Sequence, residues 1–258
     1  MLRAIWNSVS AMNAQQNKLD SISNNIANAS TVGYKSEDVN FQDLMYETLN
    51  RAGYPVNSSA TTPLISGDGT KTTEWIRNTE QGSLLETNKK TDFAIDGQGF
   101  FRVTLPGSKV AYERAGDFNV DKAGNLVDSN GNKVEIIRNA AGNGQILTND
   151  NFVVNSKGYV YIKNGNQDML YGKINVYNVI GQDSMISIGD NLYTPKQGTQ
   201  VYQNNNANIN QGYLEQSNVD MGTEMTDMIL AQRAFELNSK ALTTSDEMWG
   251  LINSMKSR

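Results

Sequence analysis

Apolar residues recur at intervals of seven positions near the N-terminus of the chain. Beside the main row runs a second row with the same period, which contains Val9 and has a polar residue at its next position, Gln16. Apolar rows with this period are typical of a helix that packs against a second helix in the manner of a coiled coil. The main row of the predicted seam consists of Ile5, Met12, Leu19 and Ile26.

A second row with the same period lies near the C-terminus. It consists of Met221, Met228, Phe235, Leu242 and Trp249. Ser217 or Asn218 is suited to cap the start of this helix, and Glu224 follows in its first turns, where the helix dipole favours negative charge. The two patterns predict a terminal helical domain made of residues 1–35 and 213–258, with a coiled-coil-like seam.

Between the helices the apolar period changes from seven to two. Apolar and polar residues alternate in "DFAIDGQGFFRVTL", and turn sequences such as "DKAGN" and "NSKG" separate the apolar runs. Residues 75–212 are therefore predicted to form a central, all-β domain that is antiparallel and barrel-like, which makes the chain an α+β protein. Residues 196–212, rich in Asn and Gln, are predicted to be an extended return segment outside the core.

Residues 36–74 are expected to form an extended arm between the first helix and the β domain. The arm contains "NRAGYPVNSSATTPLISGDGTK", which is rich in Ser, Thr, Gly and Pro. Proline stiffens such a segment locally, and large side chains near its ends can anchor it by burial. The candidate stiffeners and anchors are Tyr46, Leu49, Pro55, Pro63 and Trp75.

The composition excludes several classes of chemistry. The chain has no His and no Cys, so a Ser-His-Asp triad, a Cys-His pair and almost every kind of zinc site are excluded. Its formal net charge of -5, without a cluster of Lys and Arg, argues against nucleic acid as a partner. The first residues lack the continuous apolar run of a cleaved signal peptide or a membrane span, so any export is expected to use another route.

Three features resemble functional sites, and each has a simpler interpretation. The glycines of "DGQGFF" precede a strand-like run rather than a helix, which favours a turn over a nucleotide site. "DSNGN" lacks the further acids of a calcium loop and is better interpreted as a hairpin turn. A pair of carboxylates could hydrolyse glycans, but no pair stands out. We therefore predict no catalytic residue, no metal site, no cofactor and no small-molecule substrate.

The stretch "NNIANASTVGYKS" ends the first helix abruptly. Asn28 and Thr31 are small polar residues suited to a turn, and Gly33 can reverse the chain at low steric cost. Tyr34 and Lys35 would then enter the arm. These five residues are the candidate helix-to-arm turn.

The same stretch resembles the N-terminal signature of the bacterial flagellar axial proteins, the family of rod, hook and hook-associated subunits. "TDFAIDGQGFFRV", "AYERAGDFNVDKAGNLV" and "GYLEQSNVDMGTEMTDMILAQRAFELNSKAL" resemble later parts of that family, in the family's order and over nearly the whole chain. Within the family, the resemblance favours the distal segment of the rod. The arm sequence "NSSATTPLISGDGTK" matches it only loosely, so a proximal-rod or hook-like subunit is the alternative.

The resemblance implies a structural subunit and not an enzyme, although a wall-glycan hydrolase is the competing class. Such a subunit polymerises with copies of itself into a tubular drive shaft that transmits torque from motor to hook and encloses the export channel. The implied partners are neighbouring rod and hook subunits, the ring proteins around the rod and the flagellar type III export apparatus. The implied location is the basal body in the cell envelope, reached without a cleaved signal. The two apolar rows would then serve polymerisation.

Overall fold

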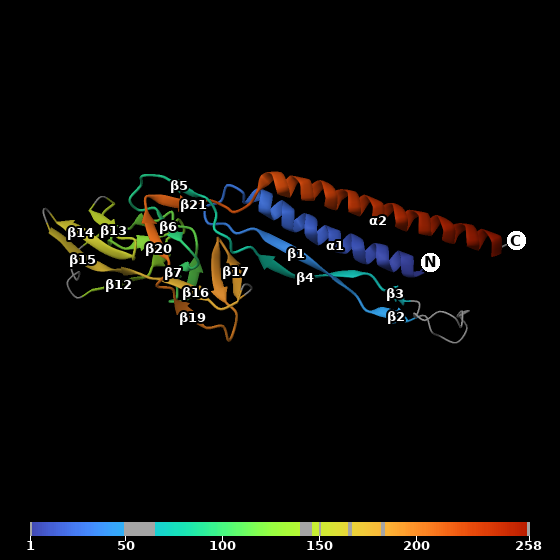
Figure 1. Ribbon diagram of the computed structural model, residues 1–258, viewed down its shortest axis with the longest axis horizontal. Coiled ribbons are helices and arrows are strands. Elements are labelled where there is room, and N and C mark those ends of the chain that lie inside the picture. The colour runs from blue at the N-terminus through green and yellow to red at the C-terminus, as the bar shows by residue number, and fades with distance from the viewer. Residues whose placement is uncertain are drawn as a thin grey trace. The chain divides into compact units, whose positions relative to one another are not determined.

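The computed structural model describes residues 2–48, 65–139, 146–149, 151–164, 167–181 and 184–256. The predicted α+β class is confirmed, with a helix near each terminus and mostly antiparallel strands between them (Figure 1). The chain divides into two compact units. The first contains Met1–Ile26, Glu37–Ile76 and Asp220–Arg258, and the second contains Ala27–Ser36 and Arg77–Val219.

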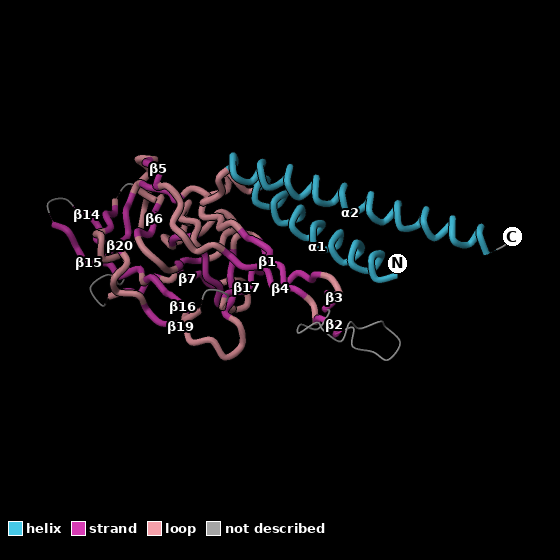
Figure 2. The backbone as a smooth tube through the Cα atoms, turned by 45° about the vertical axis from the view of Figure 1, so that its right-hand side comes forward, coloured by secondary structure: helices cyan, strands magenta, loops and turns pink. Residues whose placement is uncertain are grey.

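The first unit is built on two long helices, α1 (Leu2–Ala27) and α2 (Met221–Lys256). They lie side by side, with the start of α1 and the end of α2 at the same end of the pair (Figures 1 and 2). The predicted cap of α2 at Ser217 or Asn218 is wrong. Asp220 caps the helix instead, because its Oδ1 accepts hydrogen bonds from the backbone N–H groups of Gly222 at 2.8 Å and Thr223 at 3.3 Å.

The most buried positions of the helix pair are not those of the predicted apolar rows. On α1 they include Ala14 and Ile22, and on α2 they are Ala231 and Ser245. The half-buried members of the predicted rows are Ile5, Val9, Met12, Leu19, Ile26, Met228, Phe235 and Leu242. Two further members, Met221 and Trp249, are exposed. Small side chains thus occupy several of the most buried positions, and the larger apolar residues lie beside them.

The arm forms two short strand pairs in the same unit. β1 (Glu37–Asp43) pairs with β4 (Thr70–Arg77), and β2 (Tyr46–Thr48) pairs with β3 (Ile65–Gly67) in antiparallel fashion. Tyr46 is therefore part of a strand, and Trp75 in β4 is 37% exposed. Leu49, Pro55 and Pro63 lie outside the described residues.

Polar side chains of α1 hold the arm strands. Ser21 Oγ and Asn25 Nδ2 donate to the carbonyl oxygen of Glu37 at 2.5 and 2.9 Å, and Asn25 Oδ1 accepts from the Glu37 N–H at 2.9 Å. Further along α1, Asn17 Nδ2 donates to Thr72 Oγ1 at 2.8 Å. The polar face of this helix is therefore used within the unit, because it satisfies backbone and side-chain groups of the arm.

The largest sheet of the second unit has nine strands. Its main path runs in the order β17, β18, β8, β7, β11, β10, β9, and β16 joins β7 and β19 beside it. The strands are β7 (Phe100–Thr104), β8 (Val110–Glu113), β9 (Asn119–Val120), β10 (Leu126–Val127), β11 (Lys133–Val134), β16 (Val176–Val179), β17 (Met185–Gly189), β18 (Leu192–Pro195) and β19 (Val201–Gln203). Among the described strands β17 and β9 end the path without pairing to each other, so the predicted barrel is not closed.

Smaller sheets complete the β domain. A four-stranded antiparallel sheet contains β12 (Ile136–Arg138), β15 (Gln167–Ile174), β14 (Tyr159–Asn164) and β13 (Phe152–Val154), in that order. Two strand pairs are formed by β6 (Phe93–Asp96) with β20 (Asn208–Gln211), and by β5 (Leu84–Glu86) with β21 (Tyr213–Glu215). The core is aromatic at its centre, where the ring centroid of Phe118 lies 5.3 Å from that of Phe101 and 6.1 Å from that of Phe93.

Both predicted turns are confirmed. "DGQG" joins β6 to β7, with Gly97 and Gly99 at φ values of 111° and 143°. "DSNGN" joins β10 to β11, and Asp128 Oδ1 accepts from the N–H groups of Asn130 and Asn132 at 2.9 and 2.8 Å. Among the described residues no cluster of three acidic side chains could hold a metal ion.

The prediction that residues 196–212 lie outside the core is wrong. This segment contains β19 and β20, and Ile209 of β20 is 2% exposed within the main core cluster. Its asparagines and glutamines alternate with the few apolar residues, Ala207 and Ile209, that face inward. A strand of period two needs only those residues for its buried face.

None of the described helices is long and apolar enough to cross a membrane.

Glu113 at the end of β8 is an unusual buried acid. It is 3% exposed, and its Oε1 has no hydrogen-bond partner among the described residues. Burial, reinforced by the nearby carboxylates of Asp128 and Asp117, raises the pKa of Glu113 from 4.5 to about 9. The folded protein therefore carries a neutral Glu113 at pH 7.

We expect this residue to make the β domain less stable as the pH rises from about 5 to 9. Across that range the folded state keeps the Glu113 proton and the unfolded state releases it, so the free energy of unfolding should fall by up to about 1.4 kcal/mol per pH unit. Urea unfolding at several pH values in this range measures the change. The free energy of unfolding of Glu113→Gln should fall clearly less per pH unit than that of the wild type. The control Glu86→Gln, at an exposed acid of β5, should keep the wild-type slope. Equal slopes for all three proteins would contradict the neutral state of Glu113.

Candidate functional site

The segment that follows α1 folds into the β domain. After Asn28, whose carbonyl accepts from the Thr31 N–H at 3.0 Å, the chain reverses at Gly33 with φ of +68°. A Cβ at this position would lie 2.6 Å from the backbone nitrogen of Ala115, so a side chain is excluded by contact as well as by conformation. The Gly33 N–H donates to the carbonyl oxygen of Glu215 at 2.8 Å.

Lys35 is buried two residues later. It is 3% exposed, and its Nζ lies 2.6 Å from Glu215 Oε1 and 2.6 Å from the carbonyl oxygen of Glu80. Burial lowers the pKa of Lys35, and the hydrogen bond to Glu215 opposes that shift. The expectation that Lys35 enters the arm is therefore wrong, because its charge is paired inside the β domain.

Arg114, the residue after β8, approaches the same carboxylate. It is 4% exposed, and its Nε lies 2.5 Å from Glu215 Oε2. Its Nη2 donates to the carbonyl of Gly97 at 2.7 Å, and its Nη1 donates to the carbonyl of Gly99. The planar guanidinium thus binds the carboxylate and the β6–β7 turn at the same time.

Glu215 at the end of β21 lies between the two cations. It is 1% exposed, and Oε1 also accepts from the Gly82 N–H at 3.0 Å. We call Lys35, Arg114 and Glu215 the ionic junction. Removal of one member of such a buried group lowers the stability of the folded protein, because it leaves an uncompensated charge in the interior.

Asn218 extends the junction toward α2. Its Oδ1 accepts from the Ser36 N–H at 2.8 Å, and its Nδ2 donates to the carbonyls of Asn78 and Glu80 at 3.1 Å each. The segments that lead out of α1 and into α2 are therefore bonded to each other and to the chain between β4 and β5. These contacts also explain why Asn218 does not cap α2.

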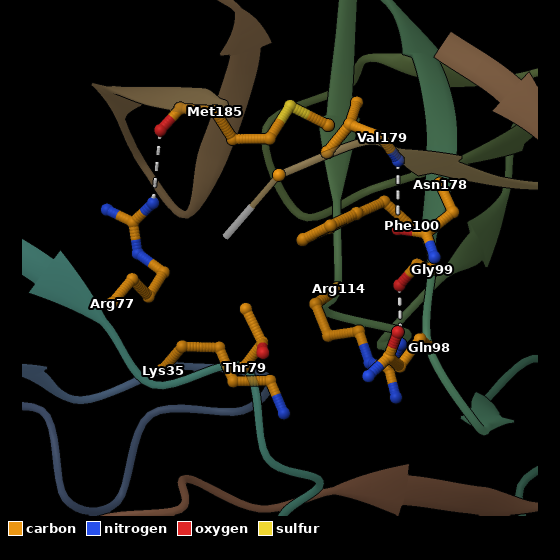
Figure 3. Close-up of a pocket in the computed structure, with 11 residues that line it drawn as sticks. Lys35, Arg77, Thr79, Gln98, Gly99, Phe100, Arg114, Asn178, Val179 and Met185 are labelled. Carbon is orange, nitrogen blue, oxygen red and sulfur yellow. Dashed lines mark hydrogen bonds between the residues drawn. The ribbon is translucent and has the colours of Figure 1, made fainter. Parts of the chain in front are cut away.

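A cavity of about 260 Å³ lies beside the junction in the second unit (Figure 3). Arg77 reaches the carbonyl of Met185 at 3.4 Å, and Arg114 points to Gly99 on the other side. None of the described residues that line the cavity is acidic, and Lys35 Nζ is already bonded to Glu215 and Glu80. The described lining residues therefore include no pair of a carboxylate and a free cation.

The structure assigns the predicted helix-to-arm turn to the β domain, and it adds two charged residues that were not predicted. The helix-to-arm turn, from Asn28 to Lys35, lies in the second unit, where Gly33 and Lys35 contact Glu215. The sequence did not single out Arg114 or Glu215. They stand within "AYERAG" and "GYLEQS", and a charged residue among strand-forming neighbours was the only available signal.

Three family models match the chain in order. The model described as "Flagella basal body rod protein" matches residues 5–35, and "Flagellar hook protein FlgE/F/G D1 domain" matches residues 94–201. "Flagellar basal body rod FlgEFG protein C-terminal" matches residues 210–255.

Known proteins are similar over almost the whole chain. The flagellar basal-body rod protein FlgG of Borreliella burgdorferi is 38% identical over 266 residues, covering 99% of each chain. The protein of the same name from Bacillus subtilis is 36% identical over 262 residues, covering 96% of this chain and 97% of its own. This chain belongs to the flagellar basal-body rod protein family. The flagellar hook-basal body complex protein FlhP of Bacillus subtilis is 29% identical over 279 residues, covering 99% of this chain and all of its own.

Each matched segment of this rod-family chain supplies one member of the ionic junction. Lys35 lies in the first matched segment, Arg114 in the second and Glu215 in the third. The three segments are therefore joined at one buried point.

We expect Glu215→Gln to lower the free energy of unfolding by about 3–5 kcal/mol, because two buried cations lose their counter-charge. Urea unfolding of the full chain measures this change. The matched control is Glu236→Gln in the exposed pair between Arg233 and Glu236, which should change stability by less than about 0.5 kcal/mol. A Glu215→Gln protein as stable as the control would show that the junction does not hold the segments together.

Proposed function

We propose that this protein is a non-enzymatic structural subunit of the flagellar basal-body rod and polymerises through its terminal helices. Membership of the rod family supports this function. The physical observation that carries it is the apolar surface that α2 exposes in the single subunit.

This outer stripe of α2 is large and exposed. The exposed fractions of its best-exposed members range from 59% to 78%. They are Ile229, Leu230, Leu237, Leu251 and Met255. An extended apolar surface is unfavourable in water and indicates a contact with another chain. α2 therefore has one face for its own subunit and one for a neighbour.

The proposed neighbour is another copy of the same chain in an open helical assembly. Head-to-tail contacts produce such an assembly when the two contacting surfaces differ and the rotation does not close. The half-buried rows on α1 and α2, from Ile5 to Ile26 and from Met228 to Leu242, would complete coiled-coil-like contacts when subunits pack. The resulting tube would transmit torque from motor to hook and enclose the export channel.

Other parts of the proposal follow from the family. Neighbouring rod and hook subunits, ring proteins and the type III export apparatus are the proposed partners, and the basal body is the proposed location. A distal-rod position is favoured by the sequence resemblance. A hook-like or proximal-rod subunit is the second candidate, and the match to the hook-basal body complex protein FlhP supports it.

We expect Leu237→Asp to abolish polymerisation and to leave the stability of the monomer nearly unchanged. Leu237 is 68% exposed in the single chain, so the carboxylate is solvated there, but it would be buried without a partner in the assembled tube. Electron microscopy detects the tubes, and thermal unfolding monitors the monomer. The control Gln232→Asp introduces the same charge on an exposed position of α2 outside the stripe. Normal tubes from Leu237→Asp would exclude the outer stripe as an assembly surface.

A further inference from the structure

A second cavity lies in the β domain, away from the ionic junction. It measures about 230 Å³ and is bordered by the β14–β15 hairpin and by the chain between β19 and β20, which Figure 1 shows in the same domain. Its lining includes Lys157, Tyr159, Lys173, Asn175 and Gln203. We call this cavity the amide groove. None of these residues is acidic.

The groove contains a buried polar side chain with an unused donor. Asn175 is 5% exposed, and its Oδ1 accepts from Gln203 Nε2 at 2.8 Å. Among the described residues Asn175 Nδ2 has no acceptor and Gln203 Oε1 has no donor. Nδ2 is not one of the fully enclosed atoms that lack a partner, so it is open to the groove and can donate to an acceptor that enters it.

Two lysines place positive charge around the same groove. Lys173 lies directly opposite Tyr159 in the β14–β15 register, with its Nζ 5.4 Å from the Tyr159 ring centroid. Lys157 in the preceding turn donates to Asn208 Oδ1 at 3.3 Å. Within the described part of the chain neither lysine has an acidic partner. The groove therefore combines uncompensated positive charge with a free amide donor, which suits a carboxylate.

We propose that the amide groove binds an acidic sugar, a pyranose ring that carries a carboxylate. The lysines would neutralise the carboxylate, and Asn175 Nδ2 would donate to a ring oxygen or hydroxyl. Gln203 Oε1 would accept from a hydroxyl, and Tyr159, 39% exposed, would contact the ring. The volume is below the roughly 300–1,000 Å³ of sites for drug-sized ligands, which matches one sugar unit.

The mixed hydrogen-bonding set favours a sugar over an acidic peptide side chain. A carboxylate of Asp or Glu is only an acceptor, so it would use the lysines and Asn175 but gain no bond from Gln203 Oε1, which is exposed and would stay hydrated. Sugar hydroxyls both donate and accept. Binding of this kind does not depend on polymerisation, so it can be measured on a monomer whether or not the proposed rod assembly is correct.

The test is a calorimetric or NMR titration of the full-length monomer, such as the Leu237→Asp protein, with three probes. Glucuronate carries both ring and carboxylate, glucose lacks the carboxylate, and N-acetylglutamate amide lacks the ring. We expect glucuronate to bind at one site at least about tenfold more tightly than either of the others, since a charge-assisted hydrogen bond contributes roughly 1.5–3 kcal/mol.

Substitutions locate the site. The double variant Lys157→Met and Lys173→Met keeps the apolar stems and should weaken glucuronate binding at least about tenfold. The control Lys163→Met, at an exposed lysine of β14 outside the groove, should leave it unchanged.

Several results would overturn the proposal. If glucose bound as tightly as glucuronate, the lysines would have no role in binding. If N-acetylglutamate amide bound as tightly as glucuronate, the groove would be assigned to an acidic peptide. No saturable binding of glucuronate, or binding that the double variant retains, would show that the amide groove is not the site.

Discussion

The fold depends on one carboxylate that is buried between two cations. Glu215 is bound by Lys35, which precedes it by 180 residues, and by Arg114, which precedes it by 101. A buried charge is costly unless its partners are in place, so we expect these segments to be stable only together. The junction thereby fixes, within the β domain, where the chain leaves the first helix and where it enters the second. Gly33 allows the chain after the first helix to pass close to the backbone of Ala115, because any side chain at this position would collide with that backbone.

In the helix pair, too, polar side chains form contacts inside the subunit. Asn25 bonds the backbone of Glu37 and also donates to Glu224 Oε1 on α2 at 2.8 Å, so one amide links both helices and the arm. Several large apolar side chains of α2 stay exposed in the single subunit. The proposed contact with a neighbouring copy would bury them.

The sequence predicted what local patterns determine. The terminal helices, the antiparallel strands and the turns at "DGQG" and "DSNGN" all depend on periods or on turn residues that are close in the chain. The ionic junction was missed, because no local pattern indicates that Arg114 and Glu215 meet. The cap at Asp220 was missed for the same reason, since Asn218 is withdrawn from capping by distant partners. Whether a set of strands closes into a barrel likewise depends on pairings that the period does not specify.

Native-state hydrogen exchange of the Gly33 and Gly82 amides tests the central role of the junction most directly. These two N–H groups donate to the carbonyl and to the carboxylate of Glu215. If the junction is part of the cooperative core, both should exchange as slowly as core amides such as Phe93, with an opening free energy close to that of global unfolding. Fast exchange of both amides while the core stays protected would show that the segments open independently, and would contradict the account.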